Sequence, residues 1–75
     1  MNIRQQFTAI IEREGEGYVS LCPELDIASL GNSVEEARQN LIEALELFFE
    51  TADTSEVQSR LRGEVFVTRV EVSVG

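Results

Sequence analysis

One amphipathic helix is encoded between Ser33 and Ala52, and it constrains the fold more than any other feature. Ser33 and Glu36 stand in an S-x-x-E capping box, in which the Ser33 hydroxyl accepts from the N–H of Glu36 and the Glu36 carboxylate reaches back to the N–H of Ser33. Apolar residues then recur at spacings of three and four: Val34, Ala37, Leu41, Ala44, Leu45, Phe48 and Ala52, flanked by Ile42 and Phe49. The pattern predicts a helix that buries one broad face and frays near residues 52–54.

Short strands are predicted on the N-terminal side of this helix. Residues 3–12 alternate, with Ile3, Phe7, Ala9 and Ile11 on one face, which is typical of a half-buried strand. Residues 13–17 have turn chemistry, so residues 18–22 should form the second arm of a hairpin that Pro23 ends. Residues 27–30 predict a third strand, which Gly31 and Asn32 should break.

The C-terminal side of the helix is less uniform. Residues 54–63 fit a short helix, capped by Thr54 or Ser55 with Val57 and Leu61 inward, and fit a plain connection almost as well. Residues 64–74 are the strongest strand prediction in the chain because β-branched residues dominate them. The order predicts one α+β domain over residues 1–75, with a βββαβ sheet of about four strands and one helix layer.

Composition limits the partners. The chain of 75 residues has a formal net charge of −8, with no Lys and no His. Such a field opposes phosphate backbones and anionic membranes, so we expect no direct nucleic-acid or membrane partner. A chain this short buries only about 60% of its unfolded surface, which favours a dimer or tetramer. The single Cys22, together with the lack of a signal-peptide or membrane-spanning pattern, indicates a cytoplasmic protein.

Residues able to do chemistry are few. Glu12, Glu24, Asp26 and the helix glutamates could in principle hold Mg²⁺, but their spacing does not favour a common site, and a solvated face explains the helix glutamates better. Cys22 lacks a His partner and is interpreted as a packing thiol, and Tyr18 as an aromatic on the sheet surface. Gly15 and Gly17 precede no helix, so they predict no phosphate loop. We therefore predict no catalytic residue, cofactor or metal.

The polar face of the predicted helix is a candidate binding surface. Glu36, Glu43, Glu46 and Glu50 lie there, and a strip of one sign can steer a basic protein towards it. These four glutamates are the predicted docking residues.

The central residues resemble the HicB-like antitoxin family, also described as the UPF0150 group. The resemblance rests on the pattern Gly17, Tyr18, Cys22, Pro23, Glu24, Leu25, Gly31, Ser33 and Glu36, within the 34 residues from 17 to 50. It implies a partial RNase H-like βββαβ fold, a dimer or tetramer, and a partner of the HicA type, a small basic ribonuclease that is neutralised by occlusion.

Two departures from the family pattern are visible. The family often has Pro-Gly-Cys where this chain has Asp26, Ile27 and Ala28. Complete HicB antitoxins continue into a DNA-binding segment, whereas this sequence ends at Gly75, so it resembles the short, stand-alone members. The favoured hypothesis is an antitoxin-type binding protein. The alternatives are an orphan homo-oligomeric module and a metal-dependent nuclease relic, the latter supported by fold analogy alone.

Overall fold

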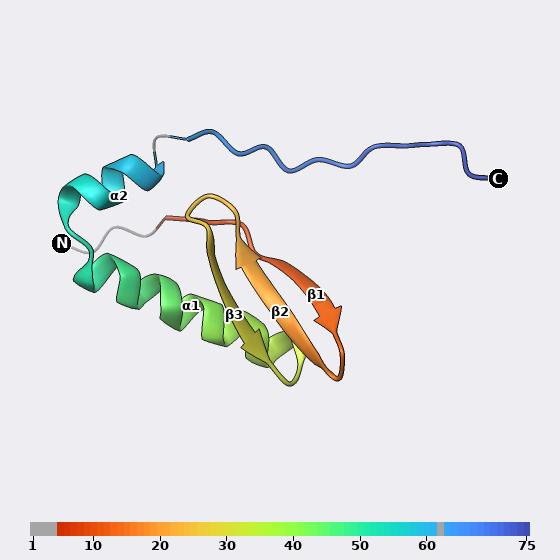
Figure 1. The fold of residues 1–75 in the computed structure, drawn as a ribbon, viewed down its shortest axis with the longest axis horizontal. Coiled ribbons are helices and arrows are strands. Elements are labelled where there is room, and N and C mark those ends of the chain that lie inside the picture. The colour runs from red at the N-terminus through yellow and green to blue at the C-terminus, as the bar shows by residue number, and fades with distance from the viewer. Residues whose placement is uncertain (1–4, 62) are drawn as a thin grey trace.

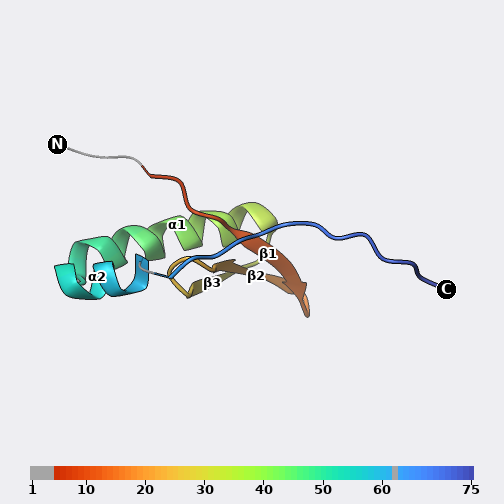
Figure 2. The ribbon, with the colours of Figure 1, turned by 90° about the horizontal axis from the view of Figure 1, so that it is seen from above.

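The fold is a three-stranded antiparallel sheet covered on one face by a long helix, with a short second helix at one end (Figures 1 and 2). The structure is a computed structural model and describes residues 5–61 and 63–75. Its elements are β1 (Ile10–Glu14), β2 (Gly17–Cys22), β3 (Ile27–Gly31), α1 (Val34–Thr51) and α2 (Thr54–Leu61). The strand order is β1-β2-β3, which confirms a small α+β domain.

The first hairpin forms as predicted, but β1 is shorter than the alternating pattern. Glu14 pairs with Gly17 across a two-residue loop, and Gly15 has a positive φ of 63° while Glu16 does not, the pattern of a type II′ turn. Ile10 pairs with Leu21, one residue before β2 ends. Residues 5–9 therefore run past the end of β2 and form no strand, and Ile3 lies outside the described residues.

Gly31 is the last residue of β3 rather than its breaker. It pairs with Tyr18 at the point where β3 meets the first turn of α1. A Cβ on Gly31 would lie 2.3 Å from the backbone nitrogen of Ala37, so this position holds the sheet and the helix at a separation that only Gly permits.

Helix α1 begins and ends close to its predicted limits. Ser33 has an extended conformation and its hydroxyl accepts from the N–H of Glu36 at 3.0 Å. The second half of the capping box differs by one residue, since the Glu36 carboxylate accepts from the N–H of Asn32 at 2.9 Å and not from Ser33. The last turn ends at Ala52, whose N–H still bonds the carbonyl of Phe48.

Of the two alternatives for residues 54–63, a short helix or a plain connection, the structure has the short helix α2. Its capping residue was not predicted from the sequence. Asp53 caps α2, because its carboxylate accepts from the N–H of Glu56 at 2.8 Å and from the Ser55 hydroxyl at 2.9 Å. The prediction that Leu61 faces inward is wrong, since Leu61 is exposed. Arg60 attaches α2 to the domain by donating to the carbonyl of Leu25 at 2.6 Å.

The core lies between α1 and the helix-facing side of β2. Its fully buried members are Ser20, Cys22, Leu25, Ala37 and Leu41. Ser20 is the one buried polar side chain among residues 5–61 and 63–75, and its hydroxyl is satisfied by donating to the carbonyl of Ala37 at 2.8 Å. Because side chains alternate along a strand, the neighbours of Ser20 and Cys22 on β2 point to the opposite face, which α1 does not cover (Figure 2).

The C-terminal segment contradicts the strongest strand prediction. Residues 63–75 contain no strand and extend away from the sheet (Figure 1), so the described part of the chain has three strands rather than about four. The radius of gyration is 14.6 Å, whereas a compact chain of this length would have about 11 Å. The partial RNase H-like fold, which requires a strand after the helix, is therefore not confirmed.

Candidate functional site

Most residues of the family pattern build the junction of the sheet and α1. Gly17 and Gly31 lie side by side, and a Cβ on Gly17 would lie 3.0 Å from the carbonyl oxygen of Gly31. Cys22 and Leu25 are buried in the core, and Ser33 caps the helix. The spacing of these residues is thus explained by packing and by capping before any binding role is considered.

A small polar cluster ties the N-terminal segment to the turn after β2. The Thr8 hydroxyl donates to one Glu24 carboxylate oxygen at 2.6 Å, and the Thr8 N–H reaches both oxygens at 3.1 Å. The Cys22 thiol donates to the other oxygen at 3.4 Å. The cluster positions residues 5–9 beside the sheet, and nothing in the alternating pattern had indicated a role for Thr8.

Titration in this cluster argues against thiol chemistry. Burial raises the pKa of the Cys22 thiol, and the neighbouring Glu24 carboxylate raises it further. A thiol that stays protonated is a poor nucleophile, which agrees with the packing role predicted for Cys22. Burial alone would raise the pKa of Glu24 as well, but the hydrogen bonds from Thr8 outweigh it and hold the pKa below its ordinary value.

The four predicted docking glutamates are all exposed on α1, but they do not play equal parts. Glu36 is engaged in the helix cap. Glu46 and Glu50 stand one turn apart on the border of a groove, while Glu43 lies on the outer face away from it. The ion pairs within residues 5–61 and 63–75 join Arg38 to Glu35 and Arg60 to Glu56, so they do not neutralise this part of the helix.

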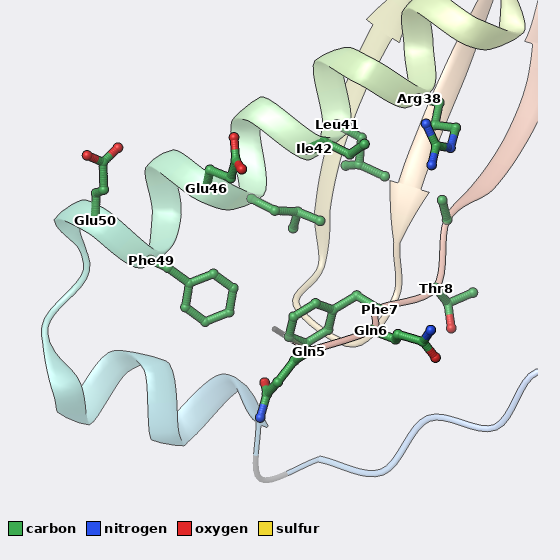
Figure 3. A pocket seen from close by; sticks show the side chains of 12 residues that line it. Gln5, Gln6, Phe7, Thr8, Arg38, Leu41, Ile42, Glu46, Phe49 and Glu50 are labelled. Carbon is green, nitrogen blue, oxygen red and sulfur yellow. The ribbon is translucent and has the colours of Figure 1, made fainter. Parts of the chain in front are cut away.

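The groove lies between residues 5–9 and the flank of α1 that faces them. Its volume is about 1230 Å³, and it is open to solvent along its length. Figure 3 shows the ring of Phe7 and the ring of Phe49 facing each other across it; their centroids are 5.6 Å apart and the rings stack at 28°. Its floor is apolar, and polar and charged side chains line its rim: Gln5, Gln6, Arg38, Glu46 and Glu50.

Carboxylates do not converge where a metal-dependent nuclease would need them. Glu24 is bonded to Thr8 and Cys22, while Glu12 lies on the hairpin, exposed. Across residues 5–61 and 63–75, no three His, Cys, Asp or Glu side chains form a group that could hold a metal ion. Tyr18 contacts Arg13, whose guanidinium carbon lies 6.0 Å from the ring centroid, and this pair belongs to the hairpin surface.

Together these features define a small, acidic α+β domain with a charged helix face and a neighbouring apolar groove. No family model matches the chain, and no solved structure matches it. It is 46% identical over 54 residues to a UPF0150 protein of Thermotoga maritima, an alignment that covers 68% of this chain and 72% of that protein.

At that identity and coverage, the chain belongs to the UPF0150 family, the HicB-like group. The resemblance read from the Gly17–Glu50 pattern is thereby confirmed at the level of the family. Among the described residues, no helix is both long enough and apolar enough to cross a membrane.

Proposed function

We propose that the protein is an antitoxin-type binding module that sequesters a small basic ribonuclease of the HicA type. It would act by covering the ribonuclease surface that RNA must reach. The observation that carries the proposal is the exposed acidic face of α1 in a chain of the HicB-like group.

Charge supports this choice of partner. The net charge of −8 resides mainly on exposed carboxylates, and α1 carries four of them besides the cap residue Glu36: Glu35, Glu43, Glu46 and Glu50. Glu35 pairs with Arg38, so Glu43, Glu46 and Glu50 are the docking residues that remain outside a cap or an ion pair. A ribonuclease that binds RNA presents basic side chains to it, so a surface of opposite sign competes for the same groups. Binding of this kind needs no catalytic residue in the antitoxin.

The test is a titration of a HicA-like ribonuclease with the purified protein. Two readouts are measured together: a complex by size-exclusion chromatography at low salt, and the rate of RNA cleavage. We expect a stoichiometric complex and a proportional loss of cleavage, with binding that weakens as salt rises. No complex at low salt together with undiminished cleavage would refute the proposal.

A charge-matched pair of variants tests the surface itself. The triple variant Glu43→Gln, Glu46→Gln, Glu50→Gln should weaken binding on the order of tenfold, about 1.4 kcal/mol, chiefly through a slower association rate. The control triple Glu12→Gln, Glu14→Gln, Glu16→Gln removes the same charge from the hairpin and should bind like the unmodified chain. Equal weakening by both triples would mean that net charge, and not the α1 face, controls binding.

A further inference from the structure

Two features of the same molecule are unpaired and complementary. One is the free edge of β1, which continues into residues 5–9 beyond the end of β2. The other is the segment 64–74, which has a strand-forming sequence and no strand partner in the described part of the chain. The edge with its extension spans ten residues and the segment spans eleven, so the two match in length.

The backbone of the edge is oriented to accept a strand. Alternate residues of β1 exchange backbone hydrogen bonds with β2 in a hairpin closed by the Glu14–Gly17 pair. The backbone N–H and C=O groups of Ile10, Glu12 and Glu14 therefore point towards β2. The N–H of Thr8 continues this alternation, because it bonds Glu24 beyond the end of β2. The backbone groups of the intervening odd-numbered residues therefore face the free edge.

The free edge borders the apolar groove. Helix α1 packs mainly on β3 and β2 and hardly touches β1, which leaves the flank of the helix above residues 5–9 uncovered. Leu41, Ile42 and Phe49 supply that flank, with Phe7 below them (Figure 3), and Leu45 also lines the groove. A strand added to the β1 edge would extend the sheet and would place one row of its side chains against this flank.

The segment 64–74 has the side chains for that position. Its largest apolar residues are mostly exposed: Phe66 by 84%, Val70 by 82% and Val74 by 93%. They share one face with Val72 by alternation, so a single row of four apolar side chains would be buried together. An exposed apolar segment of this length with strand-forming sequence promotes aggregation unless a partner covers it.

We propose that residues 64–74 of one copy pair with the free edge of β1 and residues 5–9 of a second copy, and that the exchange is reciprocal. Reciprocal exchange uses both edges and both segments, so the assembly closes as a two-fold dimer. The other free edge, β3, is less suited, because the Asn40 side chain donates to the carbonyl of Leu30 at 2.7 Å. The exchange leaves the outer face of α1 free.

Light scattering on the protein alone provides the first test. We expect twice the chain mass of 8.4 kDa for the unmodified protein. Val70→Pro removes an N–H from the added strand, and Val72→Asp places a charge in the row that would be buried against α1, so both should halve the mass. Leu47→Asp is the matched control, since Leu47 is 58% exposed and Val72 is 72% exposed in one copy, and it should stay dimeric because Leu47 lies outside the exchanged segments.

Two results would overturn the proposal: a monomer for the unmodified protein, or a dimer that survives both Val70→Pro and Val72→Asp. Circular dichroism should show unchanged helix content in these variants, because the altered residues lie outside the core. The measurements do not involve a ribonuclease, so they succeed or fail independently of the proposed neutralisation.

A second measurement needs no variant and identifies the partner chain. Protein labelled with ¹³C is mixed with unlabelled protein, unfolded and refolded together, and isotope-filtered NOEs are recorded. We expect NOEs between the valine methyl groups of residues 64–74 and residues 5–14 of the other chain. NOEs between these segments within one chain only, or none between them, would contradict the exchange.

Discussion

Residues 10–51 and residues 63–75 differ in a way that their sequences alone do not suggest. The first region has short strands interrupted by glycines and a proline, yet it packs into a hairpin, a third strand and a helix. The second is almost continuous β-branched sequence, yet its residues are exposed and unpaired. Strand propensity therefore predicted the strands less well than did the presence of a neighbouring strand or helix to pair or pack with.

The physical reason is that a strand is stabilised by its pairing. Ser20, Cys22 and Leu25 are buried because α1 and the neighbouring strands of the same chain cover them. Val70 and Val72 have no such cover within one copy, and a lone extended segment gains neither ladder hydrogen bonds nor buried area. The comparison leads to predictions in which equal chemical changes have unequal effects in the two regions.

The largest effect is expected inside α1. Leu41→Ala removes a side chain that is only 1% exposed and should cost about 3 kcal/mol of unfolding free energy. Leu47→Ala makes the same change on the outer face of the same helix and should cost no more than about 0.5 kcal/mol. Urea unfolding followed by circular dichroism measures both, and equal midpoints would refute the assigned core.

A second pair compares glycines. Gly31→Ala forces a Cβ against the backbone of α1 and should cost about 2 kcal/mol. Gly63→Ala meets nothing within 4 Å, so its midpoint in the same urea experiment should be close to that of the unmodified chain. A tolerated Gly31→Ala would show that α1 and β3 are not as close as described.

A smaller effect depends on pH. The pKa of Glu24 is lowered in the folded protein, so its contribution to stability is present above the unfolded pKa and is lost as pH falls through the folded pKa. Glu24→Gln should thus lower the free energy of unfolding at pH 7. The gap in unfolding free energy between the variant and the unmodified protein should shrink towards pH 3. Glu16→Gln, in the exposed turn, serves as the control for lost charge. A Glu24→Gln difference that is independent of pH would contradict the assigned role of Thr8.

The smallest effect on one copy is expected in the C-terminal segment. Val70→Ser alters a residue that is 82% exposed, so at high dilution it should change the unfolding free energy by no more than about 0.5 kcal/mol. At high concentration the same change should lower stability, because dimerisation contributes to it there. A large loss at high dilution would show that residues 64–74 pack within their own chain.

Sequence reasoning reached the elements whose signals are local. The capping box located the start of α1, and the glycine-containing turn at residues 13–17 located the first hairpin. It missed contacts between distant residues, such as Thr8 with Glu24 and Arg60 with Leu25, since no spacing along the chain encodes them. It also missed Asp53, because three polar residues in succession could each have capped α2.

The candidate site was predictable in part for the same reason. Helical periodicity placed Glu43, Glu46 and Glu50 on the exposed face of α1, where the structure has them. The groove could not be predicted, because it exists only where residues 5–9 run beside α1. The fourth strand was predicted from composition, but composition cannot say which chain supplies the neighbour.

Hydrogen exchange of the backbone amides in residues 64–74 and of the edge-facing amides of residues 5, 7 and 9, measured over a range of protein concentrations, tests the account most directly. The account predicts slow exchange in both segments at high concentration and fast exchange in both on dilution. Fast exchange at every concentration, or slow exchange that dilution does not change, would contradict it.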